Sequence, residues 1–405
     1  MLTRRLALLT PFVTALPALA QPRRGPLHGA AGVKQKSERA PLPVPAPATT
    51  PLGPVDTTAR WAILEDYNSG TTLLEKAADE RMPPSSMTKL MTLYIVLSRL
   101  KQGRLKLTDQ LPVSTRAWKM GGSKMFVQVG TTVSVEDLVR GIVVDSGNDA
   151  CIVLAEAISG SEEQFADLMN QTGKKLGLIN SHFVNATGWP NDDHYMCARD
   201  IATISRALIA DFPEYYHYDS ERTFTYNKIR QYNRNPMVER GTADGLKTGH
   251  TEAGGYGLVA STKRDYRRVI LVLNGMATAR ERFEEGERLT DWAFTNFEDV
   301  RLFAAGDVVQ EAPVWLGTSP TIPLVGANDL VATMPRNWRQ KGKVQVNYAT
   351  PIRAPVPKGR VLGHLTITGD GLPPYDAPLV AGMDVERLSL PGRAMAVLVH
   401  YITGS

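Results

Sequence analysis

The chain has 405 residues, of which 43% are hydrophobic and 21% are charged. This length allows two or three domains, each with its own hydrophobic core, and the composition excludes a disordered chain and a coiled coil. The 46 Lys and Arg residues against 41 Asp and Glu residues give a net charge of +5. Because this surplus is small and spread along the chain, it gives no reason to expect binding to nucleic acid.

The first twenty residues predict export. Met1–Arg5 is a basic head, Leu6–Leu19 is an apolar segment, and Ala18-Leu19-Ala20 offers small residues for cleavage. This pattern is typical of a secretory signal peptide, so we expect residues 1–20 to be removed and the mature protein to be exported. A buried N-terminal helix is the alternative, which the two prolines of the apolar segment disfavour.

Residues 21–58 are rich in Pro, Ala, Gly, Lys and Arg and predict a disordered or extended tether. The stretch 59–298 predicts one α+β domain, because strand patterns at both of its ends enclose a helical region. Two β-hairpins are expected, one around Asn68-Ser69-Gly70 and one around Lys263-Arg264-Asp265. The expected helices are 90–100, 135–159, 162–176, 198–211 and 279–297.

The sequence pattern changes after Glu298, where short β-rich runs alternate with turn residues. Residues 299–387 therefore predict a small all-β sandwich domain. The last segment, 388–405, contains an apolar-rich stretch that is too short to span a bilayer. The interpretations that stay open are an amphipathic helix in a membrane interface, a frayed end, and a strap across the β domain.

Cys151 and Cys197 are the two cysteines of the chain. They could form a disulfide in an exported protein, and we favour the alternative of two buried thiols. The sequence has no Cys-x-x-Cys and no His-Glu-x-x-His. We therefore expect neither a metal nor a cofactor.

The first segment that indicates a catalytic site is Pro83-Pro84-Ser85-Ser86-Met87-Thr88-Lys89. The prolines and serines precede a long apolar-periodic stretch and mark the start of a helix, which places Ser86 in its first turn with Lys89 on the same face. A serine hydroxyl needs a base to become a nucleophile, and a lysine with a lowered pKa can be that base. The N-terminus of a helix also favours a developing oxyanion.

Ser-x-x-Lys alone is weak evidence, because Ser98-Arg99-Leu100-Lys101 repeats it near the other end of the same helix. Two further motifs strengthen it. Ser146-Gly147-Asn148 falls within the expected helix 135–159, where it could instead be a kink or a capping turn. Lys247-Thr248-Gly249 precedes the expected strand 257–261, where it could instead be an exposed strand start.

With these motifs in this order, the sequence resembles the low-molecular-mass penicillin-binding proteins, specifically the serine-type D-alanyl-D-alanine carboxypeptidases. The resemblance covers nearly the whole mature chain and includes Arg140-Gly141, Asp149-Ala150-Cys151, Ala198-Arg199-Asp200, Asp244-Gly245-Leu246, His250-Thr251 and Gly255-Tyr256. It implies the serine β-lactamase-like fold, an antiparallel five-stranded sheet with helices on both faces. It also implies a β-rich second domain and a C-terminal amphipathic anchor.

The resemblance also implies a role for each residue of the site. Ser86 is the acylated nucleophile, Lys89 its base, and Ser146 a proton relay to the leaving amine. Asn148 binds the substrate peptide, Lys247 lowers the pKa of Lys89 by its charge, and Thr248, in the Lys247-Thr248-Gly249 motif, binds the terminal carboxylate. The backbone N–H groups of Ser86 and His250 form the oxyanion hole. Arg282 matches the position where the family places a carboxylate-binding arginine, and it is preferred over the neighbouring Arg280. A guanidinium suits this role because it matches a carboxylate in shape and charge.

The implied activity is removal of the terminal D-alanine from peptidoglycan stem peptides ending in D-Ala-D-Ala, with β-lactam antibiotics as covalent inhibitors. The implied location is the outer face of the cytoplasmic membrane. Alternatives are an endopeptidase that cuts cross-links, a serine β-lactamase and a non-catalytic cell-wall-binding protein. One departure is visible: Thr187-Gly188 stands where many relatives carry His-Gly.

Overall fold

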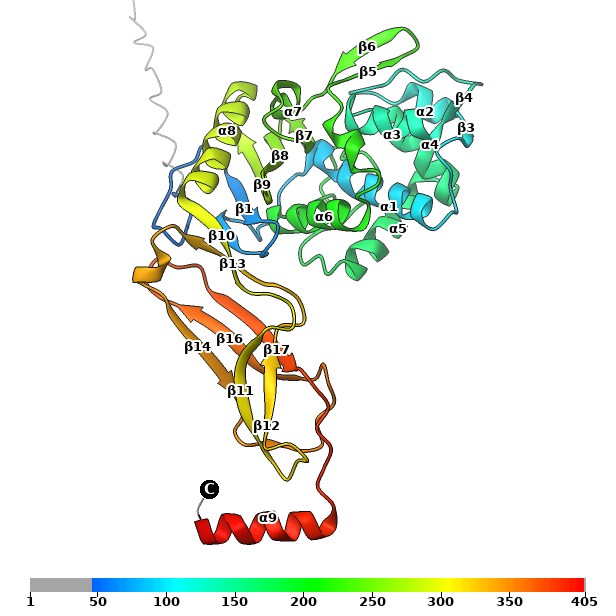
Figure 1. The fold of residues 1–405 in the computed structure, drawn as a ribbon. Helices are drawn as coiled ribbons and strands as arrows, with labels where there is room; N and C mark the ends of the chain where they lie inside the picture. The colour runs from blue at the N-terminus through cyan, green and yellow to red at the C-terminus, as the bar shows by residue number, and fades with distance from the viewer. Residues whose placement is uncertain (1–45, 404–405) are drawn as a thin grey trace, which may run out of the picture. The chain divides into compact units, whose positions relative to one another are not determined.

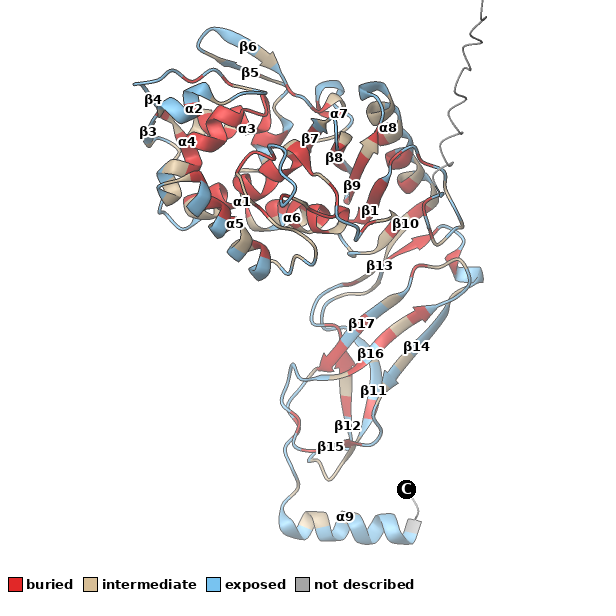
Figure 2. Ribbon diagram, turned by 180° about the vertical axis from the view of Figure 1, so that it is seen from behind, coloured by how far each residue is buried: buried red, intermediate tan, exposed pale blue. Residues whose placement is uncertain are grey.

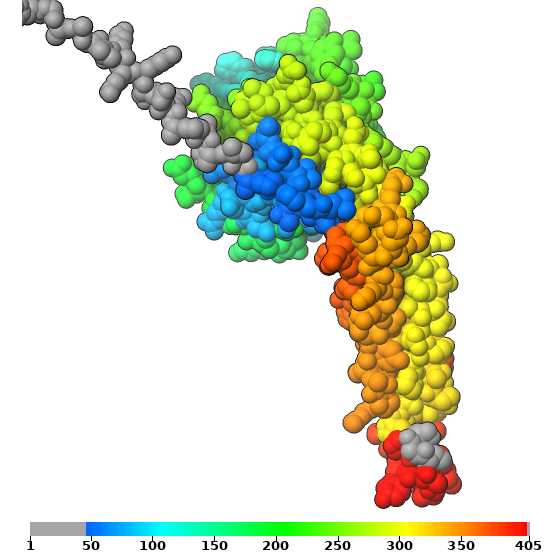
Figure 3. Space-filling model, turned by 90° about the vertical axis from the view of Figure 1, so that its left-hand side faces the viewer, coloured from blue at the N-terminus to red at the C-terminus, as the bar shows by residue number. Residues whose placement is uncertain are grey.

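The computed structural model describes residues 46–403, so the predicted signal peptide and residues 21–45 of the predicted tether lie outside it. Residues 46–58 differ from the prediction, because they pack on the folded domain instead of forming a tether. Ala48 is fully buried, and Thr49 exchanges two backbone hydrogen bonds with Glu75. The Thr57 hydroxyl donates to Glu285 at 2.6 Å, which places this segment (blue) beside the helix of Glu285 in Figure 3. An unpaired sheet edge can hold such a segment through its backbone, and composition does not reveal this.

A five-stranded antiparallel sheet forms the centre of the first domain (Figure 1). Its order is β2-β1-β9-β8-β7, so the two predicted hairpins are confirmed as β1–β2 and β8–β9. The strands are β1 (Trp61–Asp66), β2 (Thr72–Lys76), β7 (Gly245–Thr251), β8 (Gly255–Arg264) and β9 (Arg267–Met276).

Both faces of this sheet are buried, which explains the continuous apolar runs of β1 and β9 (Figure 2). Ile63 and Val272 belong to the core shared with the helical region, and Leu64 and Leu271 belong to the core shared with α8. The helices are α1 (Lys89–Lys101), α2 (Thr115–Lys119), α3 (Val135–Val143), α4 (Asn148–Ser159), α5 (Glu162–Lys175), α6 (Ala198–Asp211), α7 (Pro236–Arg240) and α8 (Ala279–Asn296). The first domain also contains two short 3₁₀ turns, η1 (Ser85–Thr88) and η2 (Tyr216–Ser220). It has two small two-stranded sheets as well: β3 (Gln110–Pro112) with β4 (Thr132–Ser134), and β5 (Thr223–Tyr226) with β6 (Ile229–Tyr232).

The predicted helices at 90–100, 162–176, 198–211 and 279–297 are present within two residues of these bounds, but the single helix expected over 135–159 is wrong. It is two helices, α3 and α4, separated at residues 144–147. Ser146 has a φ of +58° there, which a continuing helix does not allow. The apolar periodicity runs across the break because both helices bury a face against the same core.

The second domain is all-β, as predicted. It contains a six-stranded sheet in the order β14-β16-β17-β12-β11-β15 and a separate ladder, β10–β13. Met334 of the ladder and Ile367 of the sheet share one buried cluster, so the two layers pack face to face. The strands are β10 (Phe297–Phe303), β11 (Val308–Trp315), β12 (Thr321–Val325), β13 (Leu330–Pro335), β14 (Lys343–Tyr348), β15 (Ile352–Arg353), β16 (Val361–Thr368) and β17 (Tyr375–Ala381), with a 3₁₀ turn η3 (Trp338–Gln340).

The C-terminal segment forms helix α9 (Leu390–Thr403). Most of its large apolar side chains are exposed, among them Met395, Leu398 and Ile402. The ring of His400 contacts the ring of Trp315 on β11, with 4.9 Å between centroids. Across residues 46–403, no helix combines the length and the apolar character that crossing a bilayer requires.

Candidate active site

Ser86 and Lys89 meet at the start of the first long helix. The turn η1 follows Pro84 and leads directly into α1, whose first residue is Lys89. The Lys89 ammonium nitrogen lies 2.7 Å from the Ser86 hydroxyl oxygen and 2.8 Å from the carbonyl oxygen of Thr187. These distances allow direct proton transfer between the serine and the lysine.

Lys89 is fully buried, and burial lowers its pKa to about 8, against the opposing effects of Cys151 and Asp149. A lysine with this pKa is partly neutral near pH 8 and can accept a proton. The resemblance implies that the charge of Lys247 causes this shift. The structure differs on this point, because removal from water is the leading cause.

Ser146 and Asn148 flank the break between α3 and α4. Gly147 lies at the N-cap position of α4, and Asn148 is the first residue of that helix. The side-chain amide of Asn148 donates to the carbonyl oxygen of Gly121 at 2.8 Å, which fixes its orientation. The Ser-Gly-Asn motif is therefore a helix-connecting turn, the alternative that the sequence left open, and it projects Ser146 toward β7.

Lys247 completes a second serine–lysine pair. Its ammonium nitrogen donates to the Ser146 hydroxyl at 2.9 Å. Burial and the like charge of Lys89 lower its pKa well below the usual value. The Lys-Thr-Gly motif precedes the strand β8, as expected, and is itself part of a strand. It lies inside β7, which the sequence did not predict because β7 is an edge strand with little apolar alternation.

The strand β7 passes directly beside the turn η1 at Gly249. A side chain there would place its Cβ 3.1 Å from the carbonyl oxygen of Pro84, so glycine permits the close approach. Thr248 is buried beside Lys247. His250 is exposed, and its ring packs on Tyr256 with 4.0 Å between centroids.

Arg282 and Arg280 lie in different surroundings. Arg280 is 85% exposed and pairs with Glu284, one turn along α8. Arg282 lies over the ring of Tyr256, and its positive charge contributes to the lowered pKa of Lys247. Its Nε is buried without a hydrogen-bond partner. The structure thus brings Arg282, and not Arg280, near the serine–lysine pairs.

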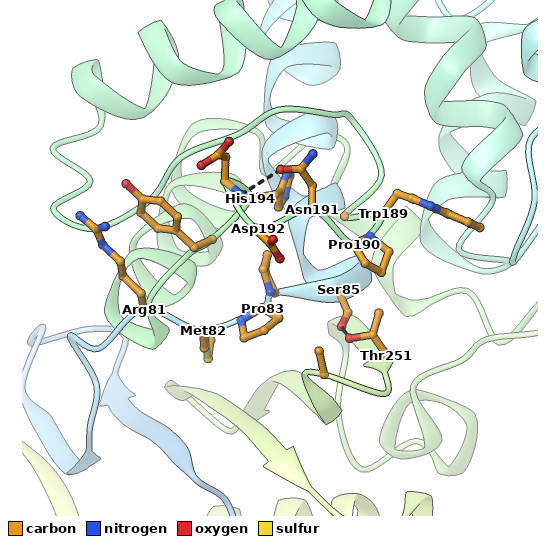
Figure 4. Close-up of a pocket in the computed structure, with 15 residues that line it drawn as sticks. Arg81, Met82, Pro83, Ser85, Trp189, Pro190, Asn191, Asp192, His194 and Thr251 are labelled. Carbon is orange, nitrogen blue, oxygen red and sulfur yellow. Dashed lines mark hydrogen bonds between the residues drawn. The ribbon is translucent and has the colours of Figure 1, made fainter.

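A cavity of about 720 Å³ opens over Ser86. Five parts of the chain line it: Ser86; Gly122 with Ser123; Asn148; the loop Thr187–Pro190; and the end of β7 with its turn, His250–Ala253. A second cavity, of about 420 Å³, shares Gly188, Trp189 and Thr251 with the first, and its lining includes Tyr195. Figure 4 shows it continuing from Trp189 and Thr251 toward Arg81. Among residues 46–403, no three His, Cys, Asp or Glu side chains gather as a metal site requires.

Several contributors to this site were not predicted. Thr187 and Gly121 act through their carbonyl oxygens, which no side-chain pattern reveals. Arg234 adds a positive charge that also lowers the pKa of Lys247, and it comes from a loop without periodicity. The second Ser-x-x-Lys lies at the end of α1, where Lys101 donates to the carbonyl oxygen of Asp211. Cys151 and Cys197 are both free and buried.

Comparison with known proteins agrees with this arrangement. The family model for D-alanyl-D-alanine carboxypeptidases matches residues 47–278, and the model for the penicillin-binding protein 5 C-terminal domain matches residues 297–387. The chain is 39% identical to the D-alanyl-D-alanine carboxypeptidase DacC of Escherichia coli over 87% of its own length and 90% of that protein.

Solved structures give the same result. Penicillin-binding protein 5 from Haemophilus influenzae is 38% identical, with a TM-score of 0.78 over 82% of this chain and 99% of that one. Penicillin-binding protein D2 from Listeria monocytogenes in its ampicillin-bound form is 29% identical, with a TM-score of 0.55 over 59% of this chain and 98% of that one. The serine–lysine pairs, the five-stranded sheet and the two matching domain models together show that the chain belongs to the family of serine-type D-alanyl-D-alanine carboxypeptidases.

Proposed function

We propose that this D-alanyl-D-alanine carboxypeptidase acts through an acyl-enzyme formed on Ser86, with Lys89 as its base. The observation that carries the proposal is the 2.7 Å contact between the Ser86 hydroxyl and the buried Lys89 amine at the start of α1. Because burial lowers the pKa of Lys89 to about 8, its neutral form is available to take the serine proton.

In the first step the Ser86 oxygen attacks the carbonyl carbon of the penultimate D-alanine while its proton passes to Lys89. The negative charge on the carbonyl oxygen is stabilised by the backbone N–H groups of Ser86 and His250. The bond to the terminal D-alanine then breaks. The leaving amine receives a proton from the Ser146 hydroxyl, which lies 2.9 Å from the Lys247 amine, and the proton that Lys89 took from Ser86 replaces it. In the second step water attacks the ester, one of its protons passes through Lys89 to the Ser86 oxygen, and the shortened peptide leaves.

The remaining site residues bind the substrate. Thr248 and Arg282 hold its terminal carboxylate, and the unpartnered Nε–H of Arg282 is a donor available for this purpose. Asn148 binds the peptide backbone with the part of its amide that Gly121 leaves free. A β-lactam presents a strained amide and a carboxylate to the same groups, so it acylates Ser86 in place of the peptide.

The finer division of the chain is also proposed: a signal peptide at 1–20, a tether that ends before residue 46, a catalytic domain to about residue 298, a β domain to 387, and α9 as a peripheral anchor. The exposed apolar side chains of α9 support attachment to the outer face of the cytoplasmic membrane from the periplasm.

The experiment is incubation of the protein with a peptidoglycan pentapeptide and, separately, with a cross-linked muropeptide dimer. We expect free D-alanine from the pentapeptide and none of the monomers that an endopeptidase would release from the dimer. Release of monomers without D-alanine would assign the endopeptidase activity instead. A protein that neither releases D-alanine nor reacts with penicillin would exclude the acyl-enzyme mechanism.

A further inference from the structure

A loop formed by residues 183–194 rests on η1, which carries Ser86, and on the start of α1. Its base is closed by backbone hydrogen bonds between His182 and Tyr195. On the side that faces α1, the carbonyl oxygen of Thr187 accepts from Lys89, and the carbonyl oxygen of Ala186 accepts from the Thr92 hydroxyl at 2.7 Å. The first part of this loop therefore determines one of the two hydrogen bonds of the Lys89 amine.

Gly188 brings this loop unusually close to the nucleophile turn. Its φ is +81°, and a Cβ built there would lie 1.8 Å from the carbonyl oxygen of Ser85 and 2.8 Å from the hydroxyl oxygen of Thr88. Any side chain at this position would push the loop away. The backbone of the loop and the backbone of η1 are thus in direct contact, and a movement of one displaces the other.

His194 makes the second connection between this loop and the turn. It is only 4% exposed and lines the smaller cavity in Figure 4. Its Nδ1 accepts a hydrogen bond from the backbone N–H of Val184 at 3.2 Å, so in the neutral ring the proton resides on Nε2. Nε2 lies 2.9 Å from the hydroxyl oxygen of Thr88 and donates to it.

The ring is held in this neutral form. Burial is the main reason that the pKa of His194 is lowered to about 4, and the charges of His182 and Lys89 lower it further. A neutral imidazole with a fixed tautomer is a steady hydrogen-bond donor over the pH range in which Lys89 titrates. The second ring nitrogen and its backbone partner determine which nitrogen faces Thr88.

We propose that His194 is a positioning residue for the acyl-transfer reaction, which holds the 183–194 loop against the nucleophile turn through Thr88 and so keeps Lys89 aimed at Ser86. This inference rests on the proposed function. Thr88 lies between the two reacting residues in the chain, and Thr187 lies in the same loop as His194. This hydrogen bond therefore acts together with the bond from Thr92 to Ala186 and holds the two surfaces that enclose the Lys89 amine.

Loss of this bond has a specific chemical consequence. If the loop moves outward, the Thr187 carbonyl leaves the Lys89 amine and water enters the space between them. Because burial is the leading cause of the lowered pKa of Lys89, hydration raises that pKa, and a higher pH is then needed to produce the neutral base. The geometry of attack also loosens, and small displacements at a reacting centre cost rate more than binding.

The test uses the purified chain and a penicillin with a fluorescent group, and measures the acylation rate constant and the initial noncovalent affinity separately as a function of pH. In His194→Leu we expect about a tenfold lower acylation rate constant and an unchanged noncovalent affinity. The midpoint of the rise in rate constant with pH should move to higher pH. His194→Gln, whose side-chain amide can donate as Nε2 does, should recover most of the rate. His182→Ala is the matched control, because this histidine lies at the base of the loop and bonds to the Asp193 carbonyl instead of Thr88.

Thr88→Val removes the acceptor without removing the ring, and it tests the proposal even if His194→Leu fails to fold. If the two residues act through one hydrogen bond, the double variant His194→Leu/Thr88→Val should be no slower than the slower single variant. Additive losses, an unmoved pH limb, or a His194→Leu protein that reacts like the wild type would overturn the inference. A wild-type protein that penicillin does not acylate would instead refute the proposed function.

Discussion

Ser86 and Ser98 provide an internal comparison, because the same short motif occurs at both ends of α1. Only Ser86 lies at the helix N-terminus beside a buried lysine; the Ser98 hydroxyl accepts from Gln102 in an exposed position. Ser86→Ala should therefore abolish the covalent penicillin adduct and the release of D-alanine, whereas Ser98→Ala should change neither. Intact-mass measurement after incubation with excess penicillin checks this, and an adduct on the Ser86→Ala protein would contradict it.

The acylation rate should rise with pH and level off above a midpoint near 8. The reason is the sign of the titration: Lys89 must be neutral to accept the serine proton, and burial lowers its pKa to about 8. Lys247→Gln should reduce the plateau but leave this midpoint in place, because removal from water is the leading cause of the lowered pKa of Lys89. Penicillin acylation rates from pH 6 to 10 measure both quantities. An upward shift of the limb in Lys247→Gln would mean that charge, and not burial, sets the pKa of Lys89.

At the scale of the elements, Asp149 connects α4 to the segment that carries Gly121. Its carboxylate is fully buried and accepts hydrogen bonds from the backbone N–H groups of Met125, Phe126 and Val127. Gly121 in turn orients Asn148. The residue therefore supports the site without contacting the cavity over Ser86.

Asp149→Ala should lower the free energy of unfolding by roughly 3 kcal/mol or more, because it leaves several buried N–H groups without an acceptor. The free energy of unfolding of Asp149→Asn, which keeps one acceptor oxygen, should lie between those of the wild type and Asp149→Ala. Denaturant melts of the three proteins measure the difference. A wild-type stability in Asp149→Ala would show that water satisfies these groups.

The sequence predicted the elements with strong periodicity and the site residues with side-chain roles. The helices α5 and α6 have clear apolar faces, and the hairpin β1–β2 has a turn signal at Asn68-Ser69-Gly70, so these were predictable. The break at Ser146 was predicted only as an alternative for the Ser-Gly-Asn motif, because α3 and α4 bury continuous apolar surface on both sides of it. The strand β7 was not predicted either, since its close packing on η1 selects small and polar residues instead of an alternating pattern.

For the whole molecule, the helix α9 gives a prediction about location. Its apolar side chains are unusually exposed, with Met395 at 61%, Leu398 at 54% and Ile402 at 72%. Burying a handful of such side chains contributes about 1.5–3 kcal/mol each, which is sufficient for reversible attachment to a bilayer surface. Deletion of residues 391–405 should therefore abolish sedimentation with liposomes and leave peptide turnover unchanged.

The alternative is that α9 is a strap packed on the β domain, and the contact of His400 with Trp315 supports it. A melting curve separates the two. We expect the truncated protein to melt at the temperature of the full chain. If it melts earlier and the full chain stays in the supernatant with liposomes, α9 is a structural strap.

The strand order of the central sheet also has a consequence for how the chain reaches its native state. β1 pairs with β9, so Trp61 cannot pair with Asn274 until about two hundred further residues have been synthesised. Until then the hairpin β1–β2 has a free edge and an apolar surface without a partner. Contacts so distant in sequence form slowly, so the central sheet cannot be complete before β8 and β9 have been synthesised. For a chain exported as we propose, this delay is an advantage, because the helical region cannot pack around an incomplete sheet.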